Sequence, residues 1–359
     1  MSTTSARVAA PVMEVFASFQ GEGLYVGQPQ VFLRLAGCPL RCRWCDTPGS
    51  WSVRPDTHAR IDAVEGVQRE NRLASPFKAA LWVAGVEPGE PRTVSVTGGE
   101  PLVRKDIVRL VELVHRRTDV DQLVMTTNAT RLSELAQPLR NAGLHGVNVS
   151  IDTLDPERFA EITRGGYLGR LLAGIHAALD VGLEVKLNTV PLLGRNDDEL
   201  AQIDDFAWSI GATPRIFELM PLGEGAKLPA QMRMNAEDVI QALGTMLERE
   251  DAAPVEGHGP ARYLPAAHGS GHRVGFITPI SNEFCDTCNR VRVTAKGDIR
   301  ACLASRRAIS LRNIIRAGGS DLDLAWAMVW SLSGKDRGHH FLEPDEHEHE
   351  RVGMSLIGG

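Results

Sequence analysis

Six cysteines stand in two groups of three along the 359-residue chain. The first group is Cys38, Cys42 and Cys45, and the second is Cys285, Cys288 and Cys302. Disulfides need pairs, whereas two odd-numbered groups with tight internal spacing predict two metal centres, each with three thiolate ligands. Reduced cysteines that merely pack as small hydrophobic residues would be scattered along the chain.

The first group has the spacing Cys-x3-Cys-x2-Cys and directly follows an apolar run, Val31–Gly37. Three thiolates can hold three irons of a cubane and leave the fourth iron without a protein ligand. That iron could chelate S-adenosylmethionine (SAM), and an electron passed into the sulfonium would release a 5′-deoxyadenosyl radical. A structural zinc ion needs four ligands, and no fourth Cys or His stands nearby.

Two further motifs fit this chemistry. The second cysteine group, Cys-x2-Cys-x13-Cys, again supplies three thiolates and an open iron, although a zinc ribbon with His268 or His272 as fourth ligand is an alternative. The segment Gly98-Gly99-Glu100-Pro101 follows a predicted strand, and its glycines would let the main chain approach the methionine part of SAM.

Regular alternation of strands and helices would position these motifs. The predicted strands are Val31–Gly37, Thr93–Thr97, Gln122–Thr126, Gly146–Ile151, Glu184–Val190 and Arg215–Met220. Helical periodicity covers Ile107–Arg117, Leu132–Ala142, Leu168–Val181 and Glu199–Ile210. Such alternation predicts parallel strands joined by right-handed crossovers, and therefore a partial (β/α)6, TIM-like α/β barrel with its chemistry at the carboxyl ends of the strands.

Two regions interrupt this rhythm. Residues 48–91 form an insertion with one apolar helical stretch, Phe77–Val86. From residue 223 onward the pattern changes to a segment that holds the second cysteine group and an apolar helix around Leu322–Leu332. The chain is therefore predicted to divide into a core barrel, 1–222, and a C-terminal iron–sulfur and substrate-binding extension, 223–359.

Composition excludes several classes of partner. The formal net charge of −6 leaves no excess of cations to neutralise a nucleic-acid backbone. No run approaches the roughly 18 apolar residues of a membrane span, and the first residues lack the pattern of a secretory signal. We therefore expect a cytoplasmic protein with no membrane and no nucleic-acid partner.

The cysteine spacing and the Gly-Gly-Glu-Pro segment together resemble the radical SAM superfamily. From Thr97 onward the chain resembles the GTP 3′,8-cyclases of molybdenum cofactor biosynthesis. The segments that carry this resemblance are Thr126-Thr-Asn128, Val147-Asn-Val-Ser-Ile-Asp152, Val185-Lys-Leu-Asn188, Phe217-Glu-Leu-Met-Pro-Leu222, Gly259-Pro-Ala-Arg-Tyr263, Phe284-Cys-Asp-Thr-Cys-Asn-Arg-Val-Arg292 and the terminal Gly358-Gly359.

This resemblance implies roles for individual residues. SAM would contact Trp44, Gly98, Gly99, Glu100, Ser150 and Met220. GTP would bind Thr126, Lys186, Arg215, Arg290 and Arg292, and the catalytic residues would be Arg290, Arg292, Gly358 and Gly359. The implied cofactors are SAM and two [4Fe–4S] clusters, the second of which would bind the guanine. The implied partners are an electron donor and, downstream, cyclic pyranopterin monophosphate synthase, with homodimerisation left open.

The first quarter resembles a different radical SAM family, the 7-carboxy-7-deazaguanine synthases of the queuosine pathway. The resemblance lies in Glu14-Val-Phe-Ala-Ser-Phe-Gln-Gly-Glu-Gly23, Val31-Phe-Leu-Arg-Leu-Ala-Gly37 and Cys45-Asp-Thr47. It implies that Gln20, Glu22 and Arg34 contact substrate and that Thr47 binds magnesium. Positions that are basic in the cyclase family hold Val31, Thr93 and Ser95 in this chain.

Three functions follow from these patterns. The first is conversion of GTP to (8S)-3′,8-cyclo-7,8-dihydroguanosine 5′-triphosphate. The second is a 7-carboxy-7-deazaguanine synthase-like reaction, and the third is a two-cluster electron carrier or zinc-binding module. The second cysteine group with Arg290 and Arg292 favours the cyclase, and SAM cleavage by the reduced protein would exclude the carrier.

Overall fold

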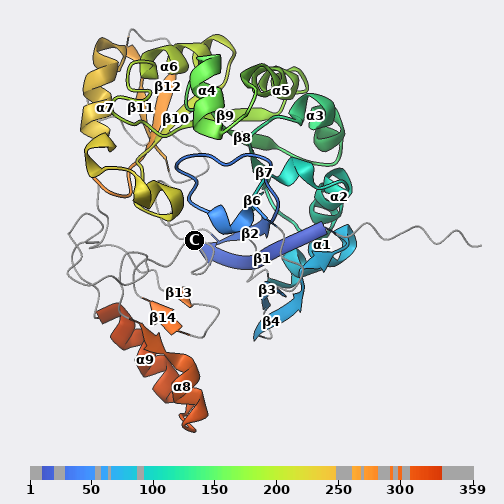
Figure 1. Ribbon diagram of the computed structural model, residues 1–359. Coiled ribbons are helices and arrows are strands. Elements are labelled where there is room, and N and C mark those ends of the chain that lie inside the picture. Colours follow the sequence, from blue (N-terminus) through green and yellow to red (C-terminus); the bar gives the residue numbers. More distant parts are fainter. Residues whose placement is uncertain are drawn as a thin grey trace, which may run out of the picture.

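The computed structural model describes residues 10–19, 29–52, 58–63, 66–86, 93–247, 261–267, 271–281, 292–293, 298–300 and 308–333. A twelve-stranded sheet forms the centre of this part of the chain (Figure 1). In sheet order its strands are β11 (Arg262–Pro265), β12 (Arg273–Ile277), β10 (Thr213–Phe217), β9 (Glu184–Thr189), β8 (Gly146–Ser150), β7 (Gln122–Thr127), β6 (Thr93–Gly98), β2 (Pro29–Leu35), β1 (Ala10–Phe19), β3 (His58–Ala63) and β4 (Gly66–Asn71), while β5 (Leu73–Ala74) pairs with β1.

The six predicted strands lie side by side in this sheet. Strands β2, β6, β7, β8, β9 and β10 are neighbours in that order, and each pair is parallel. β10 covers Thr213–Phe217 rather than the predicted Arg215–Met220, and the Glu218 side chain just beyond its end accepts a hydrogen bond from a neighbouring loop. The sheet has open edges at β11 and β4, so the predicted partial (β/α)6 barrel is confirmed.

Helices follow most of these strands, as predicted. They are α1 (Pro76–Val86), α2 (Ile107–Arg117), α3 (Leu132–Asn141), α4 (Pro156–Thr163), α5 (Leu168–Asp180) and α6 (Leu200–Ser209). The eight-residue helix α4 was not predicted, although Asp155 gives it a capping side chain that accepts a hydrogen bond from the Arg158 amide at 2.7 Å. Short 3-10 turns lie at Pro48–Ser50, Pro101–Val103, Gly223–Lys227, Ala230–Met232 and Gly244–Met246.

The N-terminal strands were missed. β1 pairs antiparallel with β2, and β3 and β4 form an antiparallel hairpin inside the 48–91 insertion, where only α1 was predicted. Charged residues such as Arg60, Asp62 and Arg69 lie in this hairpin. Their polarity removes the apolar run that identifies a buried strand from sequence.

Residues after 222 also contribute to the large sheet. β12 pairs parallel with β10, and β11 pairs antiparallel with β12, with α7 (Ala236–Leu243) between β10 and β11 in the chain. A separate small sheet contains β13 (Arg292–Val293), β14 (Asp298–Arg300) and β15 (Ile309–Ser310), and α8 (Leu311–Arg316) and α9 (Asp321–Ser333) contact β14. The predicted apolar helix near Leu322 is α9, and the proposed division at residue 222 remains a prediction.

The main hydrophobic core lies between the sheet and its helices. Leu33 and Leu35 of β2 and Val94 of β6 point into this core and are buried. Because side chains alternate along a strand, Phe32 and Arg34 project from the opposite face, which we call the inner face. In the described part of the chain, no helix is long and apolar enough to cross a membrane.

One ionisable side chain in α6 is buried without a partner. Asp204 is 0% exposed, and neither of its carboxyl oxygens has a hydrogen-bond partner in the structure. Burial, with a smaller contribution from the charge of Asp205, raises the pKa of Asp204 to about 8. The folded protein therefore holds this proton more tightly than the unfolded chain does, and the Asp204 carboxyl lowers stability progressively as the pH rises from about 4 to 8.

We therefore predict that Asp204→Asn raises the thermal unfolding midpoint much more at pH 8 than at pH 6. The predicted gain in the free energy of unfolding at pH 8 is on the order of 2–5 kcal/mol, because the amide needs no deprotonation. Asp205→Asn is the matched control, because Asp205 lies next to Asp204 on the same helix and is exposed. An equal gain for Asp204→Asn at both pH values would contradict the prediction.

Candidate active site

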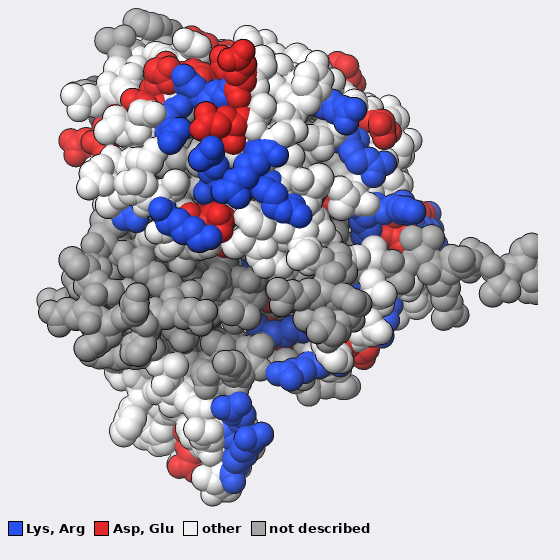
Figure 2. Space-filling view, in the orientation of Figure 1, with Lys and Arg blue, Asp and Glu red and all other residues white. Residues whose placement is uncertain are grey.

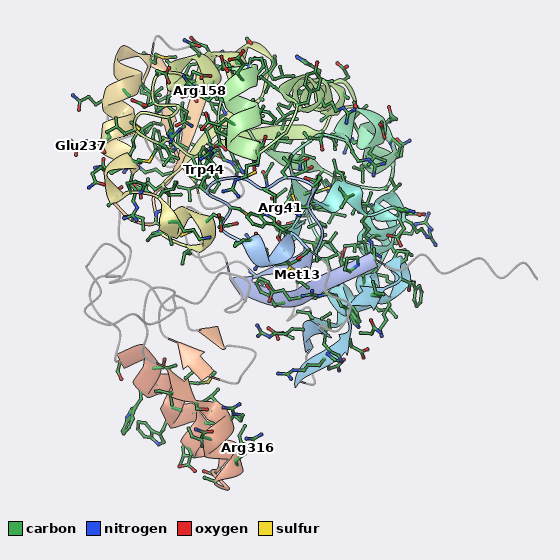
Figure 3. All side chains as sticks on the ribbon, viewed as in Figure 1. Met13, Arg41, Trp44, Arg158, Glu237 and Arg316 are labelled. Carbon is green, nitrogen blue, oxygen red and sulfur yellow. The ribbon has the colours of Figure 1, made fainter. Side chains whose placement is uncertain are left out.

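The cysteine loop, residues 37–51, follows β2 at the carboxyl edge of the sheet. Its ends are joined by backbone hydrogen bonds from Gly37 to the Ser50 carbonyl at 2.8 Å and from Cys38 to the Trp51 carbonyl at 3.2 Å. Figure 3 shows Arg41 and Trp44 on this loop, between α4 and β1. The chain therefore closes on itself around the three cysteines.

Two other segments hold the cysteine loop from outside. The amides of Arg41 and Arg43 donate to the carbonyls of Thr163 and Ile162 in α4 at 3.2 and 3.1 Å. The Glu224 amide, after β10, donates to the Cys45 carbonyl at 2.9 Å. The position of the cysteines consequently depends on both of these neighbouring elements.

A group of exposed cations surrounds the loop (Figure 2). Arg43 and Arg195 share the carboxylate of Glu161 at 3.3 and 3.2 Å, and Arg164 lies 3.7 Å from Glu224. Exposed pairs of this kind contribute only a few tenths of a kcal/mol each, at most about 1. They are not needed to explain how the loop is held.

The three thiols form no disulfide and are partly buried. Burial is the main cause that raises the pKa of Cys42 to about 12 and of Cys45 to about 11, and it also raises the pKa of Cys38. Asp152 and the other two cysteines raise the pKa of Cys42 further, because negative charges on these side chains would repel one another. Thiolates at these positions need a strongly cationic centre, since coordination to metal deprotonates a thiol.

These donors fit an iron–sulfur cluster better than a single metal ion. No group of three His, Cys, Asp or Glu side chains in the described ranges is arranged to hold one ion. In a cubane each thiolate binds a different iron, so the sulfurs need not converge on one point. The residues Cys38, Cys42 and Cys45 would hold such a cluster.

The Gly98–Pro101 segment lies directly against the cysteine loop. A Cβ on Gly99 would be 2.4 Å from the Gly37 carbonyl oxygen, and one on Gly98 would be 2.2 Å from the Leu35 carbonyl oxygen. Glycine is therefore required at both positions by the approach of the protein's own main chain. The sequence predicts that these glycines allow SAM to approach, whereas the packing of Gly98 against β2 and of Gly99 against the cysteine loop is already a sufficient cause.

Three buried glutamates fasten the loops at the carboxyl edge. Glu100 accepts from the Leu102 amide at 2.9 Å, the Thr127 hydroxyl at 2.7 Å and the Asn128 amide at 2.6 Å. Burial raises the pKa of Glu100, and these hydrogen bonds oppose that shift. The side chain predicted to contact SAM is thus occupied in joining β6 to β7.

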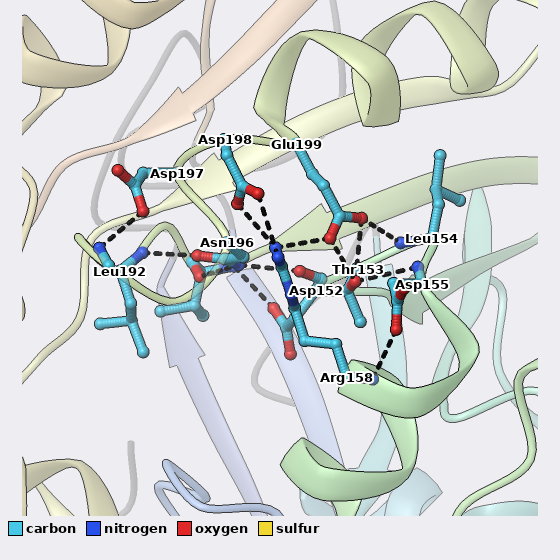
Figure 4. A network of polar contacts seen from close by, with 12 residues as sticks. Asp152, Thr153, Leu154, Asp155, Arg158, Leu192, Asn196, Asp197, Asp198 and Glu199 are labelled. Carbon is cyan, nitrogen blue, oxygen red and sulfur yellow. Dashed lines mark hydrogen bonds and ion pairs between the residues drawn. The ribbon is translucent and has the colours of Figure 1, made fainter.

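The other two glutamates act in the same way. Glu199 accepts from the Thr153 hydroxyl at 2.8 Å and the Leu154 amide at 2.7 Å, in the network of Figure 4. Glu218 accepts from the amides of Ala236 at 3.0 Å, Ile280 at 2.9 Å and Ser281 at 2.9 Å. Glu218 therefore fixes the chain just before the second cysteine group.

Two predicted SAM contacts lie at the ends of β8 and β10, the strands on either side of β9. Ser150 is exposed at the end of β8, and Met220 is half-buried after β10. Trp44 packs in a small buried cluster with Ile162, Leu192 and Leu219. The sequence prediction missed Asp152, which is half-buried beside Cys42, accepts from the Val190 amide at 2.8 Å and hydrogen-bonds Trp44. Burial raises the pKa of Asp152 to about 7.

The predicted GTP contacts of the barrel lie together on the inner face. Thr126, Asn148 and Lys186 are register partners on β7, β8 and β9. Asn188 of β9 and Arg215 of β10 are partners one step nearer the carboxyl edge. Lys186 lies 2.8 Å from Glu184, and burial lowers the pKa of Lys186 although Glu184 opposes the shift.

The residues implied by the second resemblance are placed differently. Arg34 is buried and lies 2.8 Å from Glu14, and the Thr47 hydroxyl donates to Asp46 at 3.1 Å. Val31 points into the core and is 1% exposed, so a basic residue at that position would not reach the inner face. Ser95 does lie on the inner face, whereas Gln20 and Glu22 lie outside the described residues.

Most predicted C-terminal site residues also lie outside the described part of the chain. These are Cys285, Cys288, Cys302, Arg290, Gly358 and Gly359, together with His268. The backbone of Arg292 forms part of β13, paired with Arg300. Their predicted roles remain predictions.

Comparison with known proteins agrees with this site. Residues 33–207 match the model of the radical SAM superfamily, and residues 212–341 match the model named Molybdenum Cofactor Synthesis C. The first match contains the cysteine loop, the Gly98–Pro101 segment and strands β6 to β9. The superfamily implies a [4Fe–4S] cluster and SAM.

Curated relatives define the family more closely. The GTP 3′,8-cyclase of Syntrophomonas wolfei is 34% identical over 90% of this chain and 94% of its own length. The GTP 3′,8-cyclase of Heliobacterium modesticaldum is 44% identical over 90% of this chain and 94% of its own length. The chain belongs to the GTP 3′,8-cyclase family.

These matches extend the resemblance beyond what the sequence motifs indicated. A match over 323 residues is longer than 97–359 and therefore includes part of the first quarter. A solved structure, QueE from Escherichia coli, is 22% identical, covers 63% of this chain and 92% of its own, and has a TM-score of 0.37. Because the curated relatives that match 90% of this chain are GTP 3′,8-cyclases, the deazaguanine synthase alternative is not favoured.

Proposed function

We propose that this protein converts GTP to (8S)-3′,8-cyclo-7,8-dihydroguanosine 5′-triphosphate, the first step of molybdenum cofactor biosynthesis. The observation that carries this proposal is the family membership, with relatives of that name matching 90% of the chain at 34% and 44% identity. The inner-face cations support it, because Lys186 and Arg215 lie on adjacent strands and clustered cations suit a triphosphate.

The chemistry follows from the family. When bound, the [4Fe–4S] cluster and SAM would supply a 5′-deoxyadenosyl radical able to take the C3′ hydrogen of the ribose and become 5′-deoxyadenosine. The C3′ radical would bond to C8 of guanine, and one electron from the external donor with one proton would then give the 7,8-dihydro product. The protein's part is to hold the triphosphate and to keep C3′ near the radical, since correct placement alone can contribute several kcal/mol.

We propose that the second cysteine group holds a further [4Fe–4S] cluster and that Arg290 and Arg292 complete the GTP site. Arginine suits this role because its guanidinium binds phosphate oxygens in pairs. An external electron donor reduces the clusters, and the product passes to cyclic pyranopterin monophosphate synthase.

The experiment is anaerobic incubation with SAM, reductant and GTP, followed by mass analysis of the nucleotides. We expect the cyclised triphosphate, and we expect Arg290→Ala or Arg292→Ala to weaken GTP binding at least tenfold, because a charge-assisted phosphate contact contributes about 1.5–3 kcal/mol. Arg116→Ala, at an exposed position on α2, is the matched control. Conversion of 6-carboxy-5,6,7,8-tetrahydropterin, with no product from GTP, would overturn the assignment.

A further inference from the structure

Arg215 is a buried cation whose hydrogen-bond partners are neutral side chains. It is 5% exposed. Its Nε and one terminal nitrogen donate to Asn188 Oδ1 at 2.9 and 2.7 Å, and the same terminal nitrogen donates to Asn148 Oδ1 at 2.8 Å. The two amides come from β9 and β8, so the guanidinium is held across neighbouring strands.

The other side of Arg215 is shaped by a glycine. Arg215, Gly275 and Tyr263 are register partners on β10, β12 and β11. A Cβ on Gly275 would lie 2.8 Å from the Tyr263 ring and 3.0 Å from Arg215 Cγ. Without that Cβ, Tyr263 reaches over β12 and hydrogen-bonds Arg215.

The side chains that hold Arg215, which are Asn148, Asn188 and Tyr263 and which we call the clamp, do not neutralise its charge. Glu184, the carboxylate whose charge acts on Arg215, pairs with Lys186 at 2.8 Å. Buried charges are normally paired with an opposite charge, and here the amides satisfy the guanidinium without neutralising it.

We propose that Asn188 and Asn148 are positioning residues that fix Arg215 while leaving its charge available to the phosphates of the substrate. This inference rests on the proposed function. Asparagine suits the role because its oxygen accepts hydrogen bonds and carries no net charge. An aspartate in either place would orient the guanidinium equally well and would cancel the charge that the substrate needs.

The test compares binding of GTP and of guanosine to the reconstituted protein. Asn188→Leu keeps the approximate size of the side chain and removes its acceptor, so Arg215 loses its orientation. We expect the Kd for GTP to rise at least tenfold and the Kd for guanosine, which lacks phosphate, to change less than twofold. Asn141→Ala, at an exposed position at the end of α3, should change neither.

A double variant tests whether Asn188 acts through Arg215 or contacts GTP itself. Arg215→Met already lacks the cation, so adding Asn188→Leu to it should change the Kd for GTP less than twofold. A tenfold loss in that background, or an equal loss for guanosine, would overturn the inference. Should Asn188→Leu not fold, Asn148→Leu removes the other acceptor and has the same expected result.

Failure of this inference differs from failure of the proposed function. If wild-type protein yields no cyclised nucleotide from GTP, the proposed function fails. If it turns GTP over and Asn188→Leu and Asn148→Leu bind GTP as tightly as wild type, only the role of the two amides is wrong.

Discussion

Cys42→Ala is expected to abolish SAM cleavage and to lower the iron content of the reconstituted protein from about eight atoms to about four. Among the three thiols of the cysteine loop, burial raises the pKa of Cys42 furthest, to about 12. A buried thiol of this kind is not a free nucleophile near neutral pH, so its chemical use depends on coordination to a cationic centre. Iron and sulfide assays and chromatography of 5′-deoxyadenosine measure both outcomes.

The second cysteine group provides the control. Cys285→Ala should also lose about four irons, yet it should still form 5′-deoxyadenosine while converting no GTP. SAM cleavage that survives in Cys42→Ala would contradict the role of the cysteine loop. Zinc instead of iron in the second group would contradict the proposed second cluster.

Gly98→Ala should reduce 5′-deoxyadenosine formation by at least about 100-fold, because small displacements of catalytic elements are costly. Gly98 has φ of +111°, which side chains rarely adopt, and an added Cβ would lie 2.6 Å from the Leu35 nitrogen as well as 2.2 Å from its carbonyl oxygen. Both contacts are with backbone of β2, just before the cysteine loop. Relieving these clashes would therefore require the cysteine loop to move.

Gly85→Ala is the matched control for this substitution. Gly85 lies in α1, and nothing lies within 4 Å of an added Cβ. Alanine there should raise stability by up to about 1 kcal/mol and leave activity unchanged. Electron paramagnetic resonance of the reduced protein should show the SAM-dependent spectral change in Gly85→Ala and not in Gly98→Ala; its persistence in Gly98→Ala would contradict the prediction.

The parallel strands could be predicted because each is buried on its helix-facing side. Runs such as Thr93–Thr97 and Gln122–Thr126 are short, apolar and β-branched, and helices separate them. β1 was missed because the residues that it presents on the inner face include a charged one, Glu14, whose partner Arg34 lies on the next strand. The sequence alone does not reveal this ion pair, because Glu14 and Arg34 meet only when β1 and β2 lie side by side.

The candidate site also contains residues that could be predicted from the sequence and residues that could not. The cysteines could be predicted because all three ligands stand within eight consecutive residues, so their spacing is visible in the chain. The clamp on Arg215 could not, since Asn148 lies 67 residues away from it and Asn188 lies 27 residues away. Only the register of three parallel strands brings these side chains together.

Glu100, Glu199 and Glu218 have a consequence for engineering. Each carboxylate accepts hydrogen bonds from amides or hydroxyls of a loop other than its own. If one loop alone were replaced by that of a relative, one of these buried carboxylates, or its donors, would lose its hydrogen-bond partner. Chimaeras made to alter substrate choice should therefore exchange each glutamate together with the loop that it fastens, as one cassette.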